Sequence, residues 1–425
     1  MDRRLVTVVV AAGLLLGACG QEPEATPPAG EAVEITFMMW GAPEELEVWQ
    51  AVVDDFEEAN PAIAVQVDVS DWDSYWTKLN TMVAGGTPPD IFAMDAPYYL
   101  DWQSRGALLS MQPYIDKTPG FLEGFYPQTL TAYKVAEGYF GLPRDFQTVV
   151  VFYNQEMFDE ANIPYPDPDW TYDDLRQIAK QLTLDKDGDG KIDQYGFYAD
   201  LWDMELFWSE AIWAHGGDII SADHTRTLLG EPKARDAWEF IDGMVKDGSI
   251  PSPATAGEYG EDVFQSKVAA MAPIGHWAVP GYVEAGIQLG VAPMPVGPAG
   301  RATSVNSAGF VLSKESQHPD EAWEFVKFAL SEAGQQRLAA LGFAVPVLKT
   351  VAESPAYLEQ PGDLDQRLFL DALEYAHMKP VFRGYEEWSA AVGDGLSPVW
   401  DGDADLFPTL DEVVAAADEV LAKSQ

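Results

Sequence analysis

The chain of 425 residues contains little cysteine, few basic residues and few histidines. Its one cysteine cannot form an internal disulfide, and it offers no cysteine pair for a zinc site. The 25 Lys and Arg residues stand against 69 Asp and Glu residues, which gives a formal net charge of −44. A surface this acidic repels phosphate backbones and anionic headgroups, so we expect no nucleic-acid partner.

Motifs of common hydrolases and nucleotide-binding proteins are also missing. The sequence contains no Gly-x-Ser-x-Gly, His-Glu-x-x-His, Gly-x-Gly-x-x-Gly or Walker pattern, and its five histidines are scattered. Carboxylates are so numerous that no single pair identifies a glycosidase. The sequence therefore names no catalytic residue, and we predict that the protein is not an enzyme.

The N-terminus is typical of an exported lipoprotein. Two arginines precede an apolar run over residues 5–16, which is too short to span a membrane. The sequence Leu-Gly-Ala-Cys that ends at Cys19 resembles the bacterial lipobox, in which the cysteine is lipidated. The alternative is an ordinary signal peptide with an incidental cysteine. We predict a signal peptide over residues 1–18, lipidation of Cys19, and a flexible tether over residues 19–32.

The folded part alternates between strand-like and helix-like segments. Apolar or alternating runs over residues 35–40, 63–69 and 90–94 predict strands. Helical periodicity over residues 45–59 and 72–83 lies between them. This βαβαβ order predicts a parallel sheet flanked by helices, with a ligand at the carboxyl ends of the strands.

Aromatic and acidic side chains stand at these predicted strand ends. Trp40 and Trp72 follow the first two strands, and Asp95 and Tyr98 follow the third. An aromatic face stacks on the apolar face of a sugar ring, while carboxylates accept hydrogen bonds from the hydroxyl groups of the sugar. For any single tryptophan, a place in the core is the simpler interpretation. Further tryptophans at predicted loops or helix starts fit the same pattern: Trp102, Trp277 and Trp388.

One acidic loop has the spacing of an EF-hand calcium loop. The first five donors would be Asp185, Asp187, Asp189, Lys191 and Asp193. Position 12, normally a bidentate glutamate, is Gly196. The loop therefore indicates either a structural Ca²⁺ site or an acidic turn without metal.

Several segments together resemble the extracellular solute-binding proteins of sugar-type ABC importers, the maltose-binding group. Besides the lipobox, the segments that carry the resemblance are residues 82–91, 138–143, 153–154, 270–277, 309–314 and the helix around Trp323. The resemblance implies an α/β, two-lobed periplasmic-binding-protein fold. Each lobe would have a mostly parallel sheet flanked by helices, and the ligand cleft would lie between the lobes. It also implies that no cofactor is required.

The resemblance further implies domain boundaries and ligand contacts. The N-terminal lobe would comprise residues 33–144 and 305–345, and the C-terminal lobe residues 145–304 and 346–425, with crossings near 144–148, 304–307 and 345–348. Ligand contacts would come from Asp95, Tyr98, Asp145, Trp277, Arg383 and Tyr385. Arg383 and His276 depart from the usual pattern of the family, and Arg383 leaves the chemistry of the ligand open.

We therefore predict a monomeric, extracytoplasmic lipoprotein that captures a carbohydrate and delivers it to an ABC permease. Its only contact with the membrane would be the lipid anchor. One alternative is a secreted carbohydrate-active hydrolase. Another is a binder of the same fold for a peptide or a glycerophosphodiester, which convergence of Arg144 and Arg383 would favour.

Overall fold

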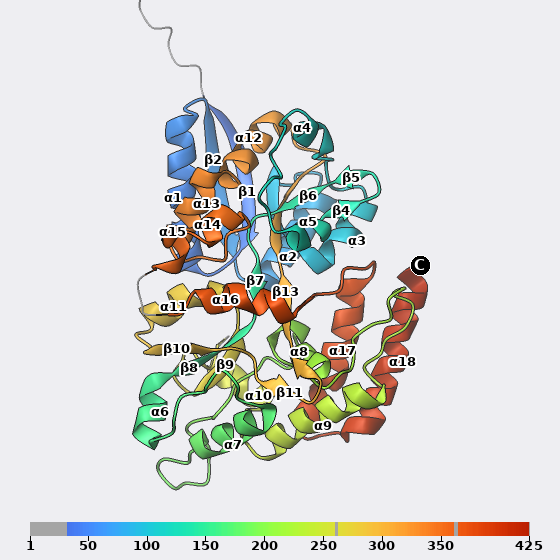
Figure 1. Ribbon diagram of the computed structural model, residues 1–425. Coiled ribbons are helices and arrows are strands. Elements are labelled where there is room, and N and C mark those ends of the chain that lie inside the picture. The colour runs from blue at the N-terminus through green and yellow to red at the C-terminus, as the bar shows by residue number, and fades with distance from the viewer. Residues whose placement is uncertain (1–31, 260–261, 361–363, 425) are drawn as a thin grey trace, which may run out of the picture.

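The computed structural model describes residues 32–259, 262–360 and 364–424, which form the two lobes seen one above the other in Figure 1. The predicted signal peptide, Cys19 and nearly all of the predicted tether lie outside these residues. None of the described helices combines the length and the apolar character needed to cross a membrane.

The N-terminal lobe is built on a five-stranded sheet in the order β2-β1-β3-β14-β6. Its strands are β1 (Val33–Trp40), β2 (Ile63–Ser70), β3 (Ile91–Asp95), β6 (Gly141–Pro143) and β14 (Ala308–Leu312). β1 pairs in parallel with β2 and β3, whereas β14 is antiparallel to β3 and β6. The three parallel strands are those predicted from the βαβαβ pattern.

Helices pack against this sheet through aromatic side chains. Phe37 of β1 contacts Trp49, Phe310 and Phe325 with ring centroids 5.3 to 5.8 Å apart. The helices of the lobe include α1 (Pro43–Ala59), α2 (Trp72–Ala84), η1 (Ala96–Tyr98), α3 (Tyr99–Ser104), α4 (Gln112–Asp116), α5 (Pro127–Thr131), α12 (Pro319–Ala329) and α13 (Glu332–Ala340). A small hairpin, β4 (Lys134–Val135) and β5 (Gly138–Tyr139), lies beside them.

The C-terminal lobe has a three-stranded sheet in the order β10-β8-β9. Its strands are β8 (Val150–Asn154), β9 (Met271–Ile274) and β10 (Leu289–Ala292). β8 is antiparallel to both neighbours, so the prediction of a mostly parallel sheet is wrong for this lobe. The reason is that β8 enters directly from the hinge, whereas β9 and β10 run the opposite way and are joined by a helical crossover.

The remaining part of this lobe is largely helical. Its elements are α6 (Gln155–Ala161), α7 (Tyr172–Leu182), η2 (Met204–Leu206), α8 (Trp208–Ala214), α9 (Pro232–Lys246), α10 (Pro253–Ala256), η3 (Gly257–Tyr259), η4 (His276–Ala278), α11 (Val279–Glu284), β11 (Val296–Gly297), β12 (Gly300–Arg301), α17 (Tyr385–Trp400) and α18 (Leu406–Ser424). α17 and α18 pack against each other and against α9 (Figure 1).

A third sheet lies between the two lobes (Figure 1). It consists of β7 (Gln147–Thr148), β13 (Thr303–Asn306) and β15 (Ala376–Met378), with α16 (Arg367–Asp371) and η5 (Ala372–Tyr375) preceding β15. β13 pairs in parallel with β15 and antiparallel with β7. The predicted crossings at residues 144–148 and 304–307 fall at β7 and β13, and we call this sheet the hinge sheet.

The third predicted crossing is wrong. α14 (Lys349–Ala352) and α15 (Pro355–Leu358) follow residues 345–348 but pack against α13 in the N-terminal lobe (Figure 1). Val345 forms a β-bridge with Phe146, which keeps this segment beside the first crossing. The C-terminal lobe therefore does not begin at residue 346, because the chain stays with the first lobe through α15.

Candidate ligand-binding site between the lobes

Five aromatic side chains form a continuous group that reaches from one lobe to the other. This aromatic stack consists of Trp40, Trp72, Trp76, Tyr98 and Tyr385. The Trp76 ring is stacked on Tyr98 with centroids 4.7 Å apart and an interplanar angle of 14°. Trp40 stacks on Trp76 with centroids 5.9 Å apart, and Trp72 meets Trp40 edge-on at 5.0 Å.

Tyr385 brings the C-terminal lobe into this stack. It is the first residue of α17, and its ring lies 5.6 Å from that of Tyr98. Beside it, the backbone N–H of Gly384 donates to both carboxylate oxygens of Asp101 in α3, at 2.9 and 3.1 Å. The two lobes therefore touch through an aromatic pair and through a carboxylate at the N-terminus of a helix.

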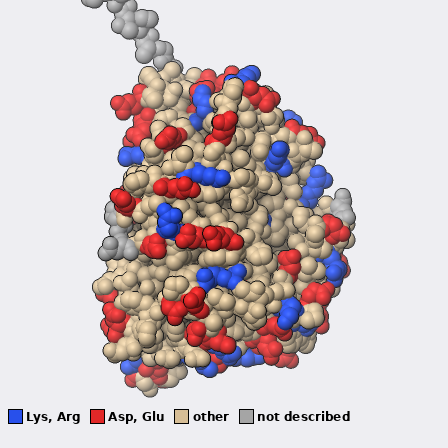
Figure 2. All heavy atoms as spheres, in the orientation of Figure 1, with Lys and Arg blue, Asp and Glu red and all other residues tan. Residues whose placement is uncertain are grey.

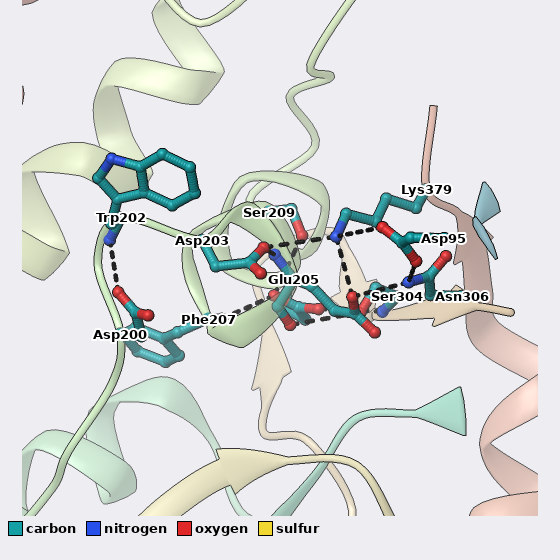
Figure 3. Close-up of polar contacts among 11 residues, drawn as sticks. Asp95, Asp200, Trp202, Asp203, Glu205, Phe207, Ser209, Ser304, Asn306 and Lys379 are labelled. Atoms are coloured by element: carbon teal, nitrogen blue, oxygen red, sulfur yellow. Dashed lines mark hydrogen bonds and ion pairs between the residues drawn. The ribbon is translucent and has the colours of Figure 1, made fainter. Parts of the chain in front are cut away.

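A buried polar group adjoins the stack at the hinge sheet. This Lys379 cluster consists of Asp95, Asp203, Glu205, Asn306 and Lys379 (Figure 3). The Lys379 ammonium lies 3.0 Å from Glu205, 3.5 Å from Asp203 and 4.0 Å from Asp95. It also lies 5.9 Å from the ring centre of Tyr385, so the cluster and the stack are neighbours.

Burial and the charge of Lys379 together determine the pKa values of the acids in the cluster. Burial raises the pKa of Glu205 to about 7, although Lys379 works in the opposite direction. Burial also raises the pKa of Asp95, again against the attraction of Lys379. Burial alone would lower the pKa of Lys379, but the surrounding acids raise it well above its ordinary value. The cluster thus holds three acids around one base and presents mainly hydrogen-bond acceptors.

A strained turn positions Glu205. Phe207 has a φ of 134°, which a residue with a side chain rarely adopts. Its N–H donates to the carboxylate of Glu210 in α8, and the same carboxylate accepts from the N–H of Ser304 in β13. Glu210 therefore ties the turn to the hinge sheet, and strain of this kind is common at binding sites.

Asp145 is connected to the stack through Arg144. Its carboxylate accepts from Arg144 Nε at 2.8 Å, and both side chains are buried. The Arg144 guanidinium lies over the rings of Trp40, Trp49 and Phe343 at 5.3 to 5.5 Å. Asp145 is thus linked to Trp40 through Arg144.

Trp277 and Arg383 are not members of the aromatic stack. Trp277 is half-buried in η4, and its ring lies so close to Gly275 that a Cβ there would be 1.7 Å from it. No ring contact joins Trp277 to the stack within residues 32–259, 262–360 and 364–424. Arg383 is exposed and lines a surface groove of about 340 Å³ together with Leu100 and His224.

Two other tryptophans belong to helices rather than loops. Trp102 lies in α3, is 2% exposed and contacts Trp76 and Phe92. Trp388 lies in α17, is fully buried and donates its Nε1–H to Thr227. Trp388 does stand in the first turn of α17, as predicted, but it is a fully buried core residue, so a ligand role for it is wrong.

Sequence reasoning brought Trp40, Trp72, Asp95, Tyr98 and Tyr385 into the site, and the structure places these five together. It missed Trp76, Glu205, Asn306 and Lys379. Trp76 stands one turn after Trp72 in a predicted helix, so helical spacing was a usable signal. The other three meet only through contacts between distant segments, for which a single sequence offers no local signal.

The acidic loop lies on the surface of the C-terminal lobe. Asp185, Asp187 and Asp193 each place a carboxylate oxygen within 4.8 Å of the others. Asp189 accepts from the N–H of Lys191. Gly196 packs against the backbone of Ala179, so position 12 has no space for a side chain.

Comparison with known families and structures supports this description. The family model described as bacterial extracellular solute-binding protein matches residues 42–336. An ABC substrate-binding protein from Listeria monocytogenes in complex with cycloalternan superimposes with a TM-score of 0.85 at 25% identity. The match covers 92% of this chain and 100% of that chain, and it confirms the predicted two-lobed α/β fold class.

Curated relatives are similar over most of the chain. A galactooligosaccharide-binding protein of Bacillus subtilis is 23% identical, covering 96% of this chain and 94% of the relative. A maltotriose-binding protein of Pyrococcus abyssi is 24% identical, covering 80% of this chain and 71% of the relative.

Proposed function

Because the chain belongs to the bacterial extracellular solute-binding proteins, we propose that it captures a carbohydrate between its lobes and delivers it to an ABC importer. The resemblance found in the sequence is confirmed by this membership. The protein is accordingly a solute-binding protein and not an enzyme.

The observation that carries the proposal is the aromatic stack beside the Lys379 cluster. Stacked aromatic faces match the apolar faces of sugar rings, and carboxylate or amide oxygens match sugar hydroxyls. Two relatives are named for the oligosaccharides that they bind, a third is named for the polyols erythritol and L-threitol, and the Listeria protein was solved with cycloalternan. This combination favours a neutral sugar over an ion.

Binding would act by shifting the population from open to closed lobes. The contacts of Tyr98 with Tyr385 and of Asp101 with Gly384 would exist only when the lobes are together. A sugar that touches both lobes binds the closed state more tightly, and closure then presents the shape that the importer recognises.

A thermal-shift screen tests the proposal directly. The panel contains maltose, maltotriose, mannotriose, galactobiose, cycloalternan and D-tagatose. A sugar at a hundred times its Kd adds about 2.7 kcal/mol to the free energy of unfolding, which gives a clear rise in Tm. Calorimetric titration then measures the affinity, and absence of binding across a wide sugar panel would reject the proposal.

The structure does not support the alternative of a phosphorylated ligand, which required Arg144 and Arg383 to converge. Arg144 is buried in its ion pair with Asp145, whereas Arg383 is exposed in a groove beside α18. The two arginines therefore do not converge. Glycerophosphodiesters belong in the screen as negative controls, and oligosaccharides incubated with the pure protein should release no product.

We also propose that the protein is a monomer anchored outside the cytoplasm through lipidated Cys19. The family is extracellular, and the lipobox supports the anchor. Mass spectrometry of protein from native membranes should find a diacylglyceryl group on Cys19, and Cys19→Ala should abolish it.

The acidic loop is proposed to hold a structural Ca²⁺. Hard oxygen donors at Asp185, Asp187 and Asp193 suit this cation, although Gly196 supplies no twelfth-position ligand. We expect a chelator to lower Tm while sugar affinity stays nearly unchanged, because the loop is far from the stack in sequence. Asp187→Asn should remove the chelator effect. A Tm that ignores both calcium and chelator would mean an acidic turn without metal.

A further inference from the structure

Two carboxamides of the hinge sheet have buried carbonyl oxygens without a partner. Asn306 in β13 and Gln147 in β7 are cross-strand partners, so their side chains project from the same face. Both are 8% exposed. Across the described ranges, neither Asn306 Oδ1 nor Gln147 Oε1 accepts a hydrogen bond. Buried carbonyl oxygens normally accept a hydrogen bond, so we expect a donor for each of these two oxygens.

The orientation of the Asn306 amide is determined by its neighbours. Its nitrogen donates to Asp95 Oδ1 at 2.6 Å and to Glu205 Oε2 at 3.1 Å, as Figure 3 shows. Turning the amide over would place its oxygen against two carboxylates, and acceptors repel one another. Both amide protons are therefore in use, and Oδ1 faces away from the acids.

Gln147 lies near Asp145 in the first crossing. Burial raises the pKa of Asp145, and the Gln147 side chain is among the groups that oppose this rise. Within the described residues, neither Gln147 Oε1 nor Asp145 Oδ1 has a hydrogen-bond partner. Both oxygens, like Asn306 Oδ1, are therefore buried acceptors without a donor.

These oxygens lie at the junction of the two lobes. Asn306 contacts Asp95, which begins the segment leading to Tyr98, and Glu205, which contacts Lys379. Lys379 in turn lies beside Tyr385. A sugar stacked on Tyr98 or Tyr385 would therefore adjoin the Lys379 cluster, to which Asn306 belongs, and Gln147 is the cross-strand partner of Asn306.

We propose that Asn306 Oδ1 and Gln147 Oε1 accept hydrogen bonds from hydroxyl groups of the bound sugar, so that the ligand contacts the hinge strands themselves. This inference rests on the proposed carbohydrate function. It adds a selection rule, because carbonyl oxygens accept donors and disfavour carboxylate or phosphate groups. Lys379 does not offset this preference, since three acids already surround it.

The test uses apolar variants of similar size. The probe is the panel sugar that binds the parent protein most tightly, together with its monodeoxy derivatives. Asn306→Leu and Gln147→Met should each lower the affinity about tenfold, and one monodeoxy derivative should bind parent and variant equally. The control is Gln335→Leu, a 1% exposed carboxamide whose nitrogen and oxygen are both hydrogen-bonded within the N-terminal lobe. It should lower Tm and leave the affinity unchanged.

The outcomes separate the two proposals. If no panel sugar binds the parent, the carbohydrate function fails and this inference fails with it. If the parent binds but the affinities of both variants equal that of the parent, the sugar does not contact these oxygens, and only this inference is overturned. Should Asn306→Leu not fold, Gln147→Met and the monodeoxy derivatives on the parent decide the matter.

Discussion

A tryptophan can be a ligand contact or a core residue, and its surroundings distinguish the two. Trp277 is half-buried against Gly275, whereas Trp388 is fully buried and hydrogen-bonded to Thr227. Trp277 lies in η4, directly after β9, and Trp388 lies in α17. Truncating these two residues should therefore have opposite effects on binding and on stability.

We expect Trp277→Ala to lower sugar affinity about thirtyfold, because it removes a stacking face worth about 2 kcal/mol. Its Tm should stay close to that of the parent. Trp388→Ala, the matched control, should cost about 3–5 kcal/mol of stability through the cavity that it opens. Titration and melting of both variants check this, and a collapsed Tm with intact binding in Trp277→Ala would contradict it.

Glu210 makes stability depend on pH. Burial raises its pKa to about 8, from an ordinary value of 4.5. Between these values the folded protein keeps a proton that the unfolded chain releases, so the free energy of unfolding falls as pH rises from about 5 to 8. Glu205, with a pKa of about 7, contributes in the same direction.

Denaturant unfolding at pH 5, 6, 7 and 8 measures this slope. Glu210→Gln should flatten it, because the amide stays neutral over the whole range. Glu239→Gln on the exposed face of α9 is the control and should leave the slope close to that of the parent. Equal slopes in the two variants would show that Glu210 is not the titrating group.

At the scale of elements, α17 meets α3 across the lobe boundary. Gly384 caps α17 with a φ of 78°, and a Cβ there would collide with Ser424. The Asp101 carboxylate accepts from the Gly384 N–H at the positive end of the helix dipole. This contact should hold the lobes closed.

Asp101→Ala should therefore raise the rate of sugar dissociation about fivefold, which corresponds to about 1 kcal/mol for a helix cap. The association rate should change little, because the contact forms after the sugar has bound. Stopped-flow tryptophan fluorescence measures both rates. Asp54→Ala on α1, in the same lobe, is the control, and a dissociation rate equal to that of the parent would refute the role of Asp101.

Local sequence patterns predicted where helices and strands lie, but not which strands pair with each other. The helical periodicity over residues 45–59 and 72–83 correctly predicted α1 and α2, which begin at Pro43 and Trp72. The antiparallel C-terminal sheet could not be predicted, because β8 and β9 are more than a hundred residues apart. The late third crossing depends likewise on packing of α14 and α15 against α13.

The residues of the site likewise fall into those that local patterns predicted and those that they did not. Trp40, Asp95 and Tyr98 were predicted because strand ends meet at one edge of a parallel sheet. Asn306 and Lys379 enter the site through contacts with residues that are 101 to 211 positions away. Such contacts depend on how the lobes close, which no local pattern contains.

At the scale of the whole molecule, negative charge is in large excess. The 69 acidic side chains outnumber the 25 lysines and arginines by 44, so most of the negative charge is not neutralised within the chain. Figure 2 shows acidic side chains spread over the visible face and not confined to one patch. Repulsion among so many like charges destabilises the compact state.

Salt should therefore stabilise the protein. The Debye length falls from about 10 Å at 0.1 M to 3 Å at 1 M ionic strength, which screens the repulsion. We expect Tm at pH 7 to rise by about 3 °C over this range of NaCl, equivalent to about 1 kcal/mol or slightly more. The gain should shrink at pH 4.5, where a larger fraction of the exposed carboxylates is protonated than at pH 7 and less repulsion is left to screen. Differential scanning calorimetry at both pH values checks this, because an equal gain at pH 4.5 would mean that salt acts on apolar burial and not on charge.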